Sequence, residues 1–422
     1  MSSLDPLAII TDLKARSIFN SRGEETIEVD LNLVGSTARV AAPAGKSKGK
    51  YEVQYYPPDG VKAAVKAVEQ KLRPKLIGLD ASDQKKIDSA LRKIDSTPNF
   101  NTIGGNTTYA ISLAAALATA NIRKTSLFSY LAVEAERRLP FPVGNVLGGG
   151  KHAGKGAPDI QEFLSIPLGA ESVYQALLAN FKVHRTLGEN LEKNVSSFTG
   201  GRGDEGAWAP HLSDSDALEA VAEACQEVSN VLGFEIRMGL DVAASSFWNE
   251  KTEKYVYASE GKTLDEGEQV DCVVSIAEQY KLAYIEDPVH EENFAGFAEI
   301  TAKVNKCLVV GDDLFVTNQQ RVVKGGQMKA ANAIIIKPNQ VGTLTDTLAT
   351  LNAAKKFKMV PIASHRSGET SEPYLAHLAV AFNCPLIKTG VLGGERVVKL
   401  NELLRIAEGL GENAKMATLE KI

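Results

Sequence analysis

Charged and polar side chains follow each of several short apolar segments in the second half of the sequence. The segments are residues 236–240, 282–285, 307–310, 333–336, 359–363 and 385–387. The groups directly after them are Asp241, Glu286-Asp287, Asp312-Asp313, Lys337, Ser364-His365-Arg366 and Lys388. One aspartate after a strand usually caps the next helix, but a lysine cannot cap a helix N-terminus and is rarely buried without a partner. The series therefore predicts one shared site rather than separate helix caps.

Three of these side chains could hold a metal ion. The carboxylates of Asp241, Glu286 and Asp312 would repel one another at neighbouring strand ends, and a divalent cation is the simplest way to hold them together. A set of oxygen ligands suits Mg²⁺ better than zinc or copper. The sequence therefore predicts a magnesium site made by three carboxylates.

The two lysines can serve different parts of a proton-transfer reaction beside such a cation. Lys337 is the candidate general base, since a nearby positive charge lowers the pKa of an amine. Lys388 is the candidate partner of a substrate carboxylate or phosphate, because one base is enough. The tract Ser364-His365-Arg366-Ser367-Gly368 offers hydroxyls, a guanidinium and backbone donors, which together suit a phosphate.

An elimination also needs an acid that helps the leaving group to depart. Glu162 and Glu205 are the candidates, with one or both held protonated by burial or by a shared proton. The competing interpretation is that isolated glutamates in loops are simply solvated. His152 lies in a glycine-rich segment that can approach a ligand closely, although a histidine there can equally be structural.

The spacing of the strand ends predicts how the chain positions these groups. The polar groups that begin at residues 286, 312, 337, 364 and 388 follow one another at intervals of 24 to 27 residues, about one strand, one helix and their loops. This period is typical of a TIM-type (βα)8 barrel, whose active site lies at the C-terminal ends of the strands.

A different pattern precedes the barrel. Residues 26–33 alternate polar and apolar side chains and predict a strand that turns into a second strand at 38–42, and helical spacing follows at 61–72 and 87–94. We therefore expect an α/β protein with an N-terminal α+β domain, residues 1–140, and a TIM-like barrel domain, residues 141–422, that carries the active site.

Composition argues against several classes of protein. The net charge of −5 over 422 residues gives no general attraction to nucleic acid. No apolar run approaches the roughly 20 residues needed to cross a bilayer, and no basic-then-apolar leader is visible, so we expect a cytoplasmic protein without a membrane partner. The four cysteines are scattered without a CxxC pair, which predicts reduced thiols rather than disulfides or structural zinc.

Several blocks of consecutive residues carry a family resemblance. They include Gly203-Asp204-Glu205-Gly206-Ala207-Trp208, Asp241-Val242-Ala243-Ala244-Ser245, Ile285-Glu286-Asp287-Pro288, Lys337-Pro338-Asn339-Gln340 and Ile387-Lys388-Thr389-Gly390. Together they resemble the enolase family over essentially the whole chain. The resemblance implies reversible dehydration of 2-phosphoglycerate to phosphoenolpyruvate in glycolysis and gluconeogenesis. It also implies one tightly bound Mg²⁺, a second one with the substrate, and at least a homodimer.

The resemblance also implies a role for each matching residue. The matches are Asp241, Glu286 and Asp312 for the tight metal, Ser47 for the second metal, Lys337 for the base, Glu205 with Glu162 for the acid side, His152, Gln161 and Lys388 for substrate contacts, and His365, Arg366 and Ser367 for the phosphate. A lysine or histidine base beside Mg²⁺ is the established scheme for this superfamily.

The sequence departs from the family pattern in its first loop. The family usually has P-S-G-A-S-T-G, whereas this chain has Pro43-Ala44-Gly45-Lys46-Ser47-Lys48-Gly49, followed by Lys50. The three lysines could form an electrostatic lid that partly does the work of the second metal, or they could be ordinary solvated lysines. Two alternatives to a true enolase follow: a divergent lyase for a related 2-hydroxy or phosphorylated acid, and a non-catalytic binding protein.

Overall fold

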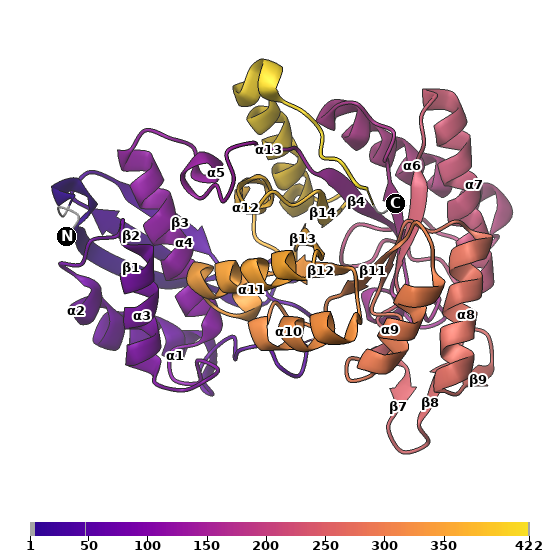
Figure 1. The fold of residues 1–422 in the computed structure, drawn as a ribbon, viewed down its shortest axis with the longest axis horizontal. Coiled ribbons are helices and arrows are strands. Elements are labelled where there is room, and N and C mark those ends of the chain that lie inside the picture. The colour runs from indigo at the N-terminus through magenta and orange to yellow at the C-terminus, as the bar shows by residue number, and fades with distance from the viewer. Residues whose placement is uncertain (1–4, 47, 421–422) are drawn as a thin grey trace.

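The computed structural model describes residues 5–46 and 48–420, which form two parts that lie side by side (Figure 1). The N-terminal part contains an antiparallel sheet of β1 (Ile10–Phe19), β2 (Glu25–Leu33) and β3 (Thr37–Ala41). In β2 the apolar residues Ile27, Val29 and Leu31 are fully buried, as the alternation predicts. The predicted hairpin is therefore confirmed, whereas β1 was not anticipated from the sequence.

Helices cover this sheet. They are η1 (Pro6–Ala8), α1 (Gly60–Ala67), the π-helical turn η2 (Val68–Leu72), α2 (Arg73–Leu76), α3 (Gln84–Asp95), α4 (Gly105–Ile122) and α5 (Leu127–Tyr130). The two helical regions expected from apolar spacing are confirmed as α1 with η2 and as α3. Helix α4 is buried along nearly its whole length, because it packs against β2, β3 and α3. Because α4 is apolar on all its faces, it lacks the amphipathic spacing that predicts a surface helix.

The second part is a closed eight-stranded barrel, as expected. Its strands are β4 (Phe141–Gly148), β5 (Glu162–Ile166), β6 (Arg237–Asp241), β10 (Tyr284–Glu286), β11 (Leu308–Gly311), β12 (Ala333–Ile336), β13 (Val360–Ser364) and β14 (Leu386–Gly390). They pair in this order, and β14 closes the barrel on β4. Alternate residues of each strand face the outer helices or the barrel interior, so the strands are apolar on both faces.

The barrel differs from a regular (βα)8 arrangement in one respect. Strand β5 is antiparallel to both of its neighbours, whereas the other pairings are parallel. The connection from β4 to β5 holds only the single turn η3 (Gly150–His152), and two helices follow β5 in succession. Because β5 is reversed, its first residue, Glu162, pairs with Asp241 at the end of β6. The reversal therefore carries a glutamate to the same end of the barrel as the other strand-end groups.

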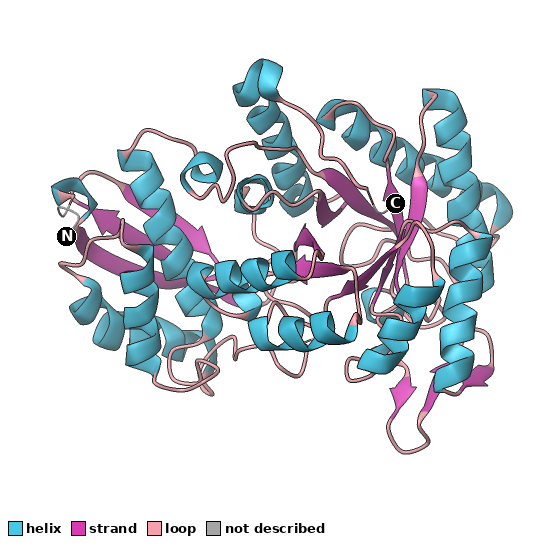
Figure 2. Cartoon of the chain, viewed as in Figure 1, coloured by secondary structure: helices cyan, strands magenta, loops and turns pink. Residues whose placement is uncertain are grey.

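The remaining helices surround the barrel strands (Figure 2). They are α6 (Val173–Asn194), α7 (Asp214–Leu232), α8 (Glu266–Gln279), α9 (Phe294–Lys303), α10 (Gln319–Met328), α11 (Leu344–Lys356), α12 (Tyr374–Ala381) and α13 (Gly394–Leu410), with short turns η4 (Ala244–Ser246), η5 (Pro338–Gln340) and η6 (Gly411–Asn413). A small sheet of β7 (Trp248–Asn249), β8 (Lys254–Tyr257) and β9 (Lys262–Leu264) projects between β6 and α8. In the described part of the chain no helix is long and apolar enough to cross a membrane. All four cysteines are free, as expected.

The first loop joins the two parts over the end of the barrel. Ala44 and Gly368 exchange two backbone hydrogen bonds, each 2.8 Å long. A side chain at Gly368 would meet the Ala44 carbonyl oxygen at 2.8 Å and the Asn20 amide at 2.6 Å, so this close approach requires glycine. The backbone N–H of Lys46 then donates to the Ser367 hydroxyl at 2.6 Å. The N-terminal part therefore contributes one wall of the space above the strands.

Candidate active site

A polar pocket lies at the C-terminal ends of the parallel barrel strands. It is lined by Gly45, Glu52, His152, Gln161, Glu162, Glu205, Asp241, Asp312, Asp313, Lys337, Ser364, His365, Arg366, Ser367 and Lys388. Of the predicted site residues that the structure describes, only Glu286 is missing from this lining, and its carboxylate contacts Lys388 directly. Ser47, the candidate ligand of a second metal, lies outside the described residues. The strand-end side chains thus converge as barrel geometry requires.

Lys388 lies at the centre of a carboxylate cluster. Its Nζ atom lies 2.7 Å from Asp241 Oδ2, 2.7 Å from Glu286 Oε2 and 3.2 Å from Glu162 Oε2. Burial alone would lower the pKa of Lys388, but these carboxylates outweigh it and raise the pKa well above its ordinary value. Lys388 is therefore suited to act as a fixed cation, and its present partners are protein carboxylates.

The carboxylate of Glu286 has one oxygen that is available to bind a metal ion. Its Oε2 atom accepts hydrogen bonds from Lys388 and Tyr284, while its Oε1 atom is buried without a hydrogen-bond partner among the described residues. Burial and the neighbouring charge of Asp241 raise the pKa of Glu286 well above its ordinary value. A buried oxygen without a partner calls for a specific explanation. Because Glu286 and Asp241 are paired residues of adjacent strands, the two carboxylates fit a hard cation such as Mg²⁺.

Asp312 and Lys337 form an ion pair on the next two strands. The Lys337 ammonium contacts Asp312 Oδ2, and Gln340 Nε2 donates to Asp312 Oδ1 at 3.2 Å. Burial alone would raise the pKa of Asp312, but Lys337 outweighs it and the pKa is lowered. Burial alone would lower the pKa of Lys337, but Asp312 outweighs it and the pKa is raised. The sequence predicts a lowered pKa for Lys337, whereas Asp312 raises it here. A lowered pKa would require a cation that neutralises Asp312.

Two other groups of possible metal ligands lie close together among the described residues. They are His152 with Glu162 and Glu205, and Asp287 with Asp312 and Asp313. Asp287 accepts the backbone N–H groups of Asp312, at 3.1 Å, and Asp313, at 2.7 Å, so it orders the chain after β11. Burial and the nearby carboxylates raise the pKa of Asp313 to about 8 and that of Asp287 well above its ordinary value. Because both carboxylate oxygens of Asp287 already accept backbone N–H groups, Asp287 is less available to a cation than Asp312.

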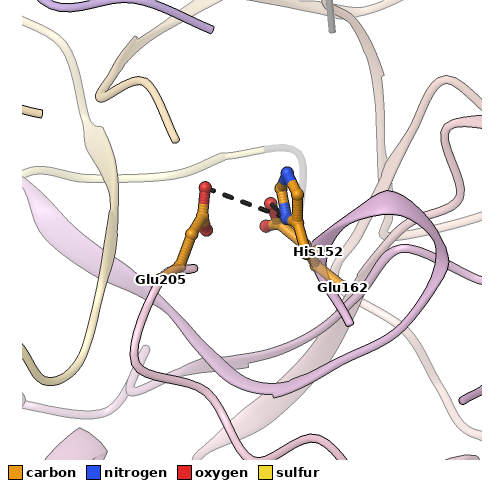
Figure 3. A group of neighbouring side chains, drawn as sticks. All are labelled: His152, Glu162 and Glu205. Atoms are coloured by element: carbon orange, nitrogen blue, oxygen red, sulfur yellow. Dashed lines mark ion pairs between the residues drawn. The ribbon is translucent and has the colours of Figure 1, made fainter. Parts of the chain in front are cut away.

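The candidate acid groups meet on the side of the pocket formed by β4, β5 and the loop before α7 (Figure 3). His152 Nδ1 lies 3.2 Å from Glu162 Oε1 and 3.9 Å from Glu205 Oε1. The two glutamates are only 2% and 3% exposed, so the interpretation of them as solvated loop residues is wrong. Burial and the charge of Glu205 raise the pKa of Glu162. Burial alone would raise the pKa of Glu205, but the hydrogen bond from His365 and the positive charge of His152 outweigh it and lower the pKa. Of the two, Glu162 therefore holds a proton more readily than Glu205.

Further contacts fix Glu205, and sequence reasoning missed two of the residues that make or support them. Asn145 Nδ2 donates to Glu205 Oε2 at 3.2 Å, and His365 Nε2 lies 3.3 Å from the same atom. Burial lowers the pKa of His365 to about 4, so the ring is neutral. Arg396, from α13, is hydrogen-bonded to the other ring nitrogen of His365. Neither Asn145 nor Arg396 shares a spacing pattern with the strand-end series, so no sequence signal identified them.

The phosphate-binding tract is organised by a residue of the N-terminal part. Arg366 forms a two-pronged contact with Glu52, in which Nη1 and Nη2 lie 3.0 and 3.1 Å from Oε2 and Oε1. Asn339 Oδ1 also accepts from Arg366 Nη1 at 3.1 Å. Glu52 additionally accepts the backbone N–H of Gly49 at 3.0 Å. Glu52 therefore ties the base of the first loop to Arg366, which the sequence could not show because 314 residues separate the two.

The three loop lysines have different surroundings. Lys46 Nζ lies 3.1 Å from Asp204 Oδ2, next to Glu205 in the chain. Lys48 Nζ donates to Gln54 Oε1 at 2.7 Å, and burial lowers its pKa. Lys50 lies on the surface, with its Nζ 5.8 Å from the centre of the Tyr51 ring. All three lysines are exposed, but the ammonium groups of Lys46 and Lys48 contact polar side chains near the pocket residues Glu205 and Glu52 in the chain, whereas no such partner of the Lys50 ammonium is found among the described residues.

Comparison with known proteins identifies the family. Residues 10–131 match the model "Enolase, N-terminal domain", and residues 136–422 match "Enolase, C-terminal TIM barrel domain". The chain is 50% identical to the enolase of Methanothermobacter thermautotrophicus over 95% of this chain and 97% of that protein. It is 48% identical to the enolase of Methanosphaera stadtmanae over 98% of this chain and 100% of that protein. It is 46% identical to the enolase of Pyrobaculum aerophilum over 98% and 99%.

These matches cover both parts of the structure and agree with the architecture described above. The resemblance and the fold class inferred from the sequence are therefore confirmed. The chain belongs to the enolase family and has its activity, that of a phosphopyruvate hydratase, a carbon–oxygen lyase.

Proposed function

We propose that the pocket at the barrel end dehydrates 2-phosphoglycerate with Lys337 as the base and Glu205 with Glu162 as the acid side. This assignment rests on the positions of the base and of the acid groups around the barrel. Lys337 follows β12 and Glu162 begins β5, and these strands are four apart in either direction around the eight-stranded barrel. A substrate between them would meet a base on one side and an acid on the other, as elimination requires.

The proposed reaction assigns one task to each side of the pocket. Lys337 removes the proton from the carbon that carries the phosphate and is bonded to the carboxylate. The acid side then gives a proton to the departing hydroxyl on the next carbon, which leaves as water. Glu162, whose pKa is raised, supplies that proton through the group it shares with Glu205 and His152. The reverse steps hydrate phosphoenolpyruvate.

Other residues would hold the substrate during these steps. His365, Arg366 and Ser367 bind the phosphate, while Gln161 and His152 contact the reacting part of the molecule. Asp241, Glu286 and Asp312 hold Mg²⁺, for which the partnerless Oε1 atom of Glu286 is the structural support. When bound, this ion would neutralise the carboxylates, polarise the substrate carboxylate and favour the neutral form of a nearby amine. Family membership also supports at least a homodimer.

The proposed function is tested by steady-state turnover of 2-phosphoglycerate with and without Mg²⁺. We expect turnover in the typical enzymatic range of roughly 1–10³ per second with Mg²⁺, and its loss when the ion is withheld. A panel of unphosphorylated 2-hydroxy acids should show no comparable turnover. Turnover of one of those acids in place of 2-phosphoglycerate, or no turnover of any of these compounds, 2-phosphoglycerate included, would contradict the proposed assignment.

The lysine-rich loop yields a separate prediction. Lys46→Ala combined with Lys48→Thr should raise the KM for substrate at low salt, because it removes two ammonium groups near the pocket that attract an anionic substrate. Activity should also depend more steeply on the Mg²⁺ concentration, because these lysines no longer do part of the work of the second metal ion. The effect on KM should shrink at high ionic strength. The matched control is Lys50→Ala, which removes a surface lysine of the same loop. Equal KM values and equal Mg²⁺ dependence for all these proteins would show that the lysines are merely solvated.

A further inference from the structure

Arg396 is an unusual cation because its side chain is fully buried and its contacts are mostly to uncharged groups. It lies near the start of α13 and is 0% exposed. Nη1 donates to the Arg366 carbonyl oxygen at 2.7 Å, and Nη2 donates to the Ser367 carbonyl oxygen at 2.8 Å. The nearest carboxylate among the described residues is Glu395, whose oxygen lies 3.6 Å from Nε. Since burying a guanidinium is costly, a specific task for it is expected.

The contact between Arg396 and His365 determines where the ring proton sits. Arg396 Nη1 lies 2.9 Å from His365 Nδ1. A guanidinium can only donate, so Nδ1 must be the acceptor. The backbone N–H of Gly390 points to the same nitrogen at 3.4 Å. His365 therefore carries its proton on Nε2, and this atom lies 3.3 Å from Glu205 Oε2.

The same guanidinium also holds the backbone on both sides of this contact. Its hydrogen bonds to the carbonyls of Arg366 and Ser367 place the phosphate-binding tract, and Nη2 lies 3.5 Å from the carbonyl oxygen of Asp204, next to Glu205. A side chain at Gly390 would meet the carbonyl oxygen of Glu205 at 2.3 Å, so the loop with Glu205 packs closely on β14 at this point. Arg396 therefore links the acid side and the phosphate tract through one rigid group.

We propose that Arg396 is a positioning residue for the acid step: it locks His365 as the Nε2–H tautomer, and that ring then orients Glu205. This inference rests on the proposed function, because it takes Glu205 to belong to the acid side. None of the contacts of Arg396 described above involves Lys337, the proposed base. Loss of Arg396 should therefore impair departure of the hydroxyl more than removal of the α-proton.

The test separates these two steps in the full-length protein. For Arg396→Gln, formation of phosphoenolpyruvate should fall about tenfold to a hundredfold relative to exchange of the α-proton with solvent, by analogy with groups that orient metal-binding histidines. The matched control is Lys399→Gln, which removes another buried cation of α13, bound to Glu369 rather than to His365. In that variant the ratio of exchange to product formation should stay as in the unmodified protein. Equal losses of exchange and product formation in Arg396→Gln would overturn the proposal.

Nitrogen NMR of ¹⁵N-histidine protein supplies a readout that needs neither substrate nor activity. The His365 signal, assigned by its absence in His365→Gln, should report a neutral ring protonated at Nε2 in the unmodified protein. Arg396→Lys keeps a cation but shortens its reach, and it should shift the ring toward a mixture of tautomers. A ring protonated at Nδ1 in the unmodified protein, or an unchanged tautomer in either Arg396 variant, would overturn the proposal. A protein that fails to turn over 2-phosphoglycerate while showing the expected tautomer would instead refute the proposed function alone.

Discussion

Replacement of Lys337 by alanine is expected to reduce turnover at least about a hundredfold, the lower range for a positioned general base. The lysine lies at the pocket wall opposite the acid side, and its ammonium is held in place by Asp312. Exchange of the substrate α-proton with solvent should stop together with turnover, since both need the same proton transfer. The measurements are steady-state turnover and deuterium incorporation into 2-phosphoglycerate.

Two controls make this result specific to the base. Lys388→Ala removes the other buried lysine, which contacts three carboxylates, so it should weaken substrate and metal binding instead of selectively stopping exchange. Thermal unfolding should be recorded for both variants, because each leaves buried carboxylates without their cation. Persistent α-proton exchange in Lys337→Ala would transfer the role of base to Lys388 or to a carboxylate.

The second large effect is expected on the metal site. Asp312→Asn keeps the shape of the side chain and removes its charge, so Mg²⁺ affinity and turnover should both fall sharply, and a chelator should abolish the activity of the unmodified protein. Titration calorimetry with Mg²⁺ in the absence of substrate measures the affinity directly. In a structure with the ion bound, oxygen distances should be about 2.0–2.1 Å.

The neighbouring residue provides the matched control for this site. Asp313→Asn changes the next carboxyl in the chain, whose pKa is raised to about 8 by burial and by Asp312. If Asp241, Glu286 and Asp312 hold the ion, Asp313→Asn should retain most of the Mg²⁺ affinity. A larger loss in Asp313→Asn than in Asp312→Asn would contradict that ligand set and favour the group of Asp287, Asp312 and Asp313.

The sequence by itself determined the barrel and the identity of most groups around its pocket. In a parallel barrel every strand begins at one end and finishes at the other, so a repeat of 24 to 27 residues that places a polar group after each apolar segment brings those groups together. Local patterns also predicted the hairpin of β2 and β3 and the helices α1 and α3. These features depend on neighbours in the chain, which is why spacing reveals them.

Only the tertiary structure decided how those groups pair and which of them hold a proton more readily. The reversal of β5 placed Glu162 opposite Asp241, and no local sequence pattern predicts the direction of a strand. Lys388 contacts three carboxylates from three other strands, and Glu162 rather than Glu205 has the raised pKa. The contacts of Glu52 with Arg366 and of Arg396 with His365 join segments distant in the chain. Burial and opposing charge set protonation, and both arise from the packed neighbours that folding brings to each side chain.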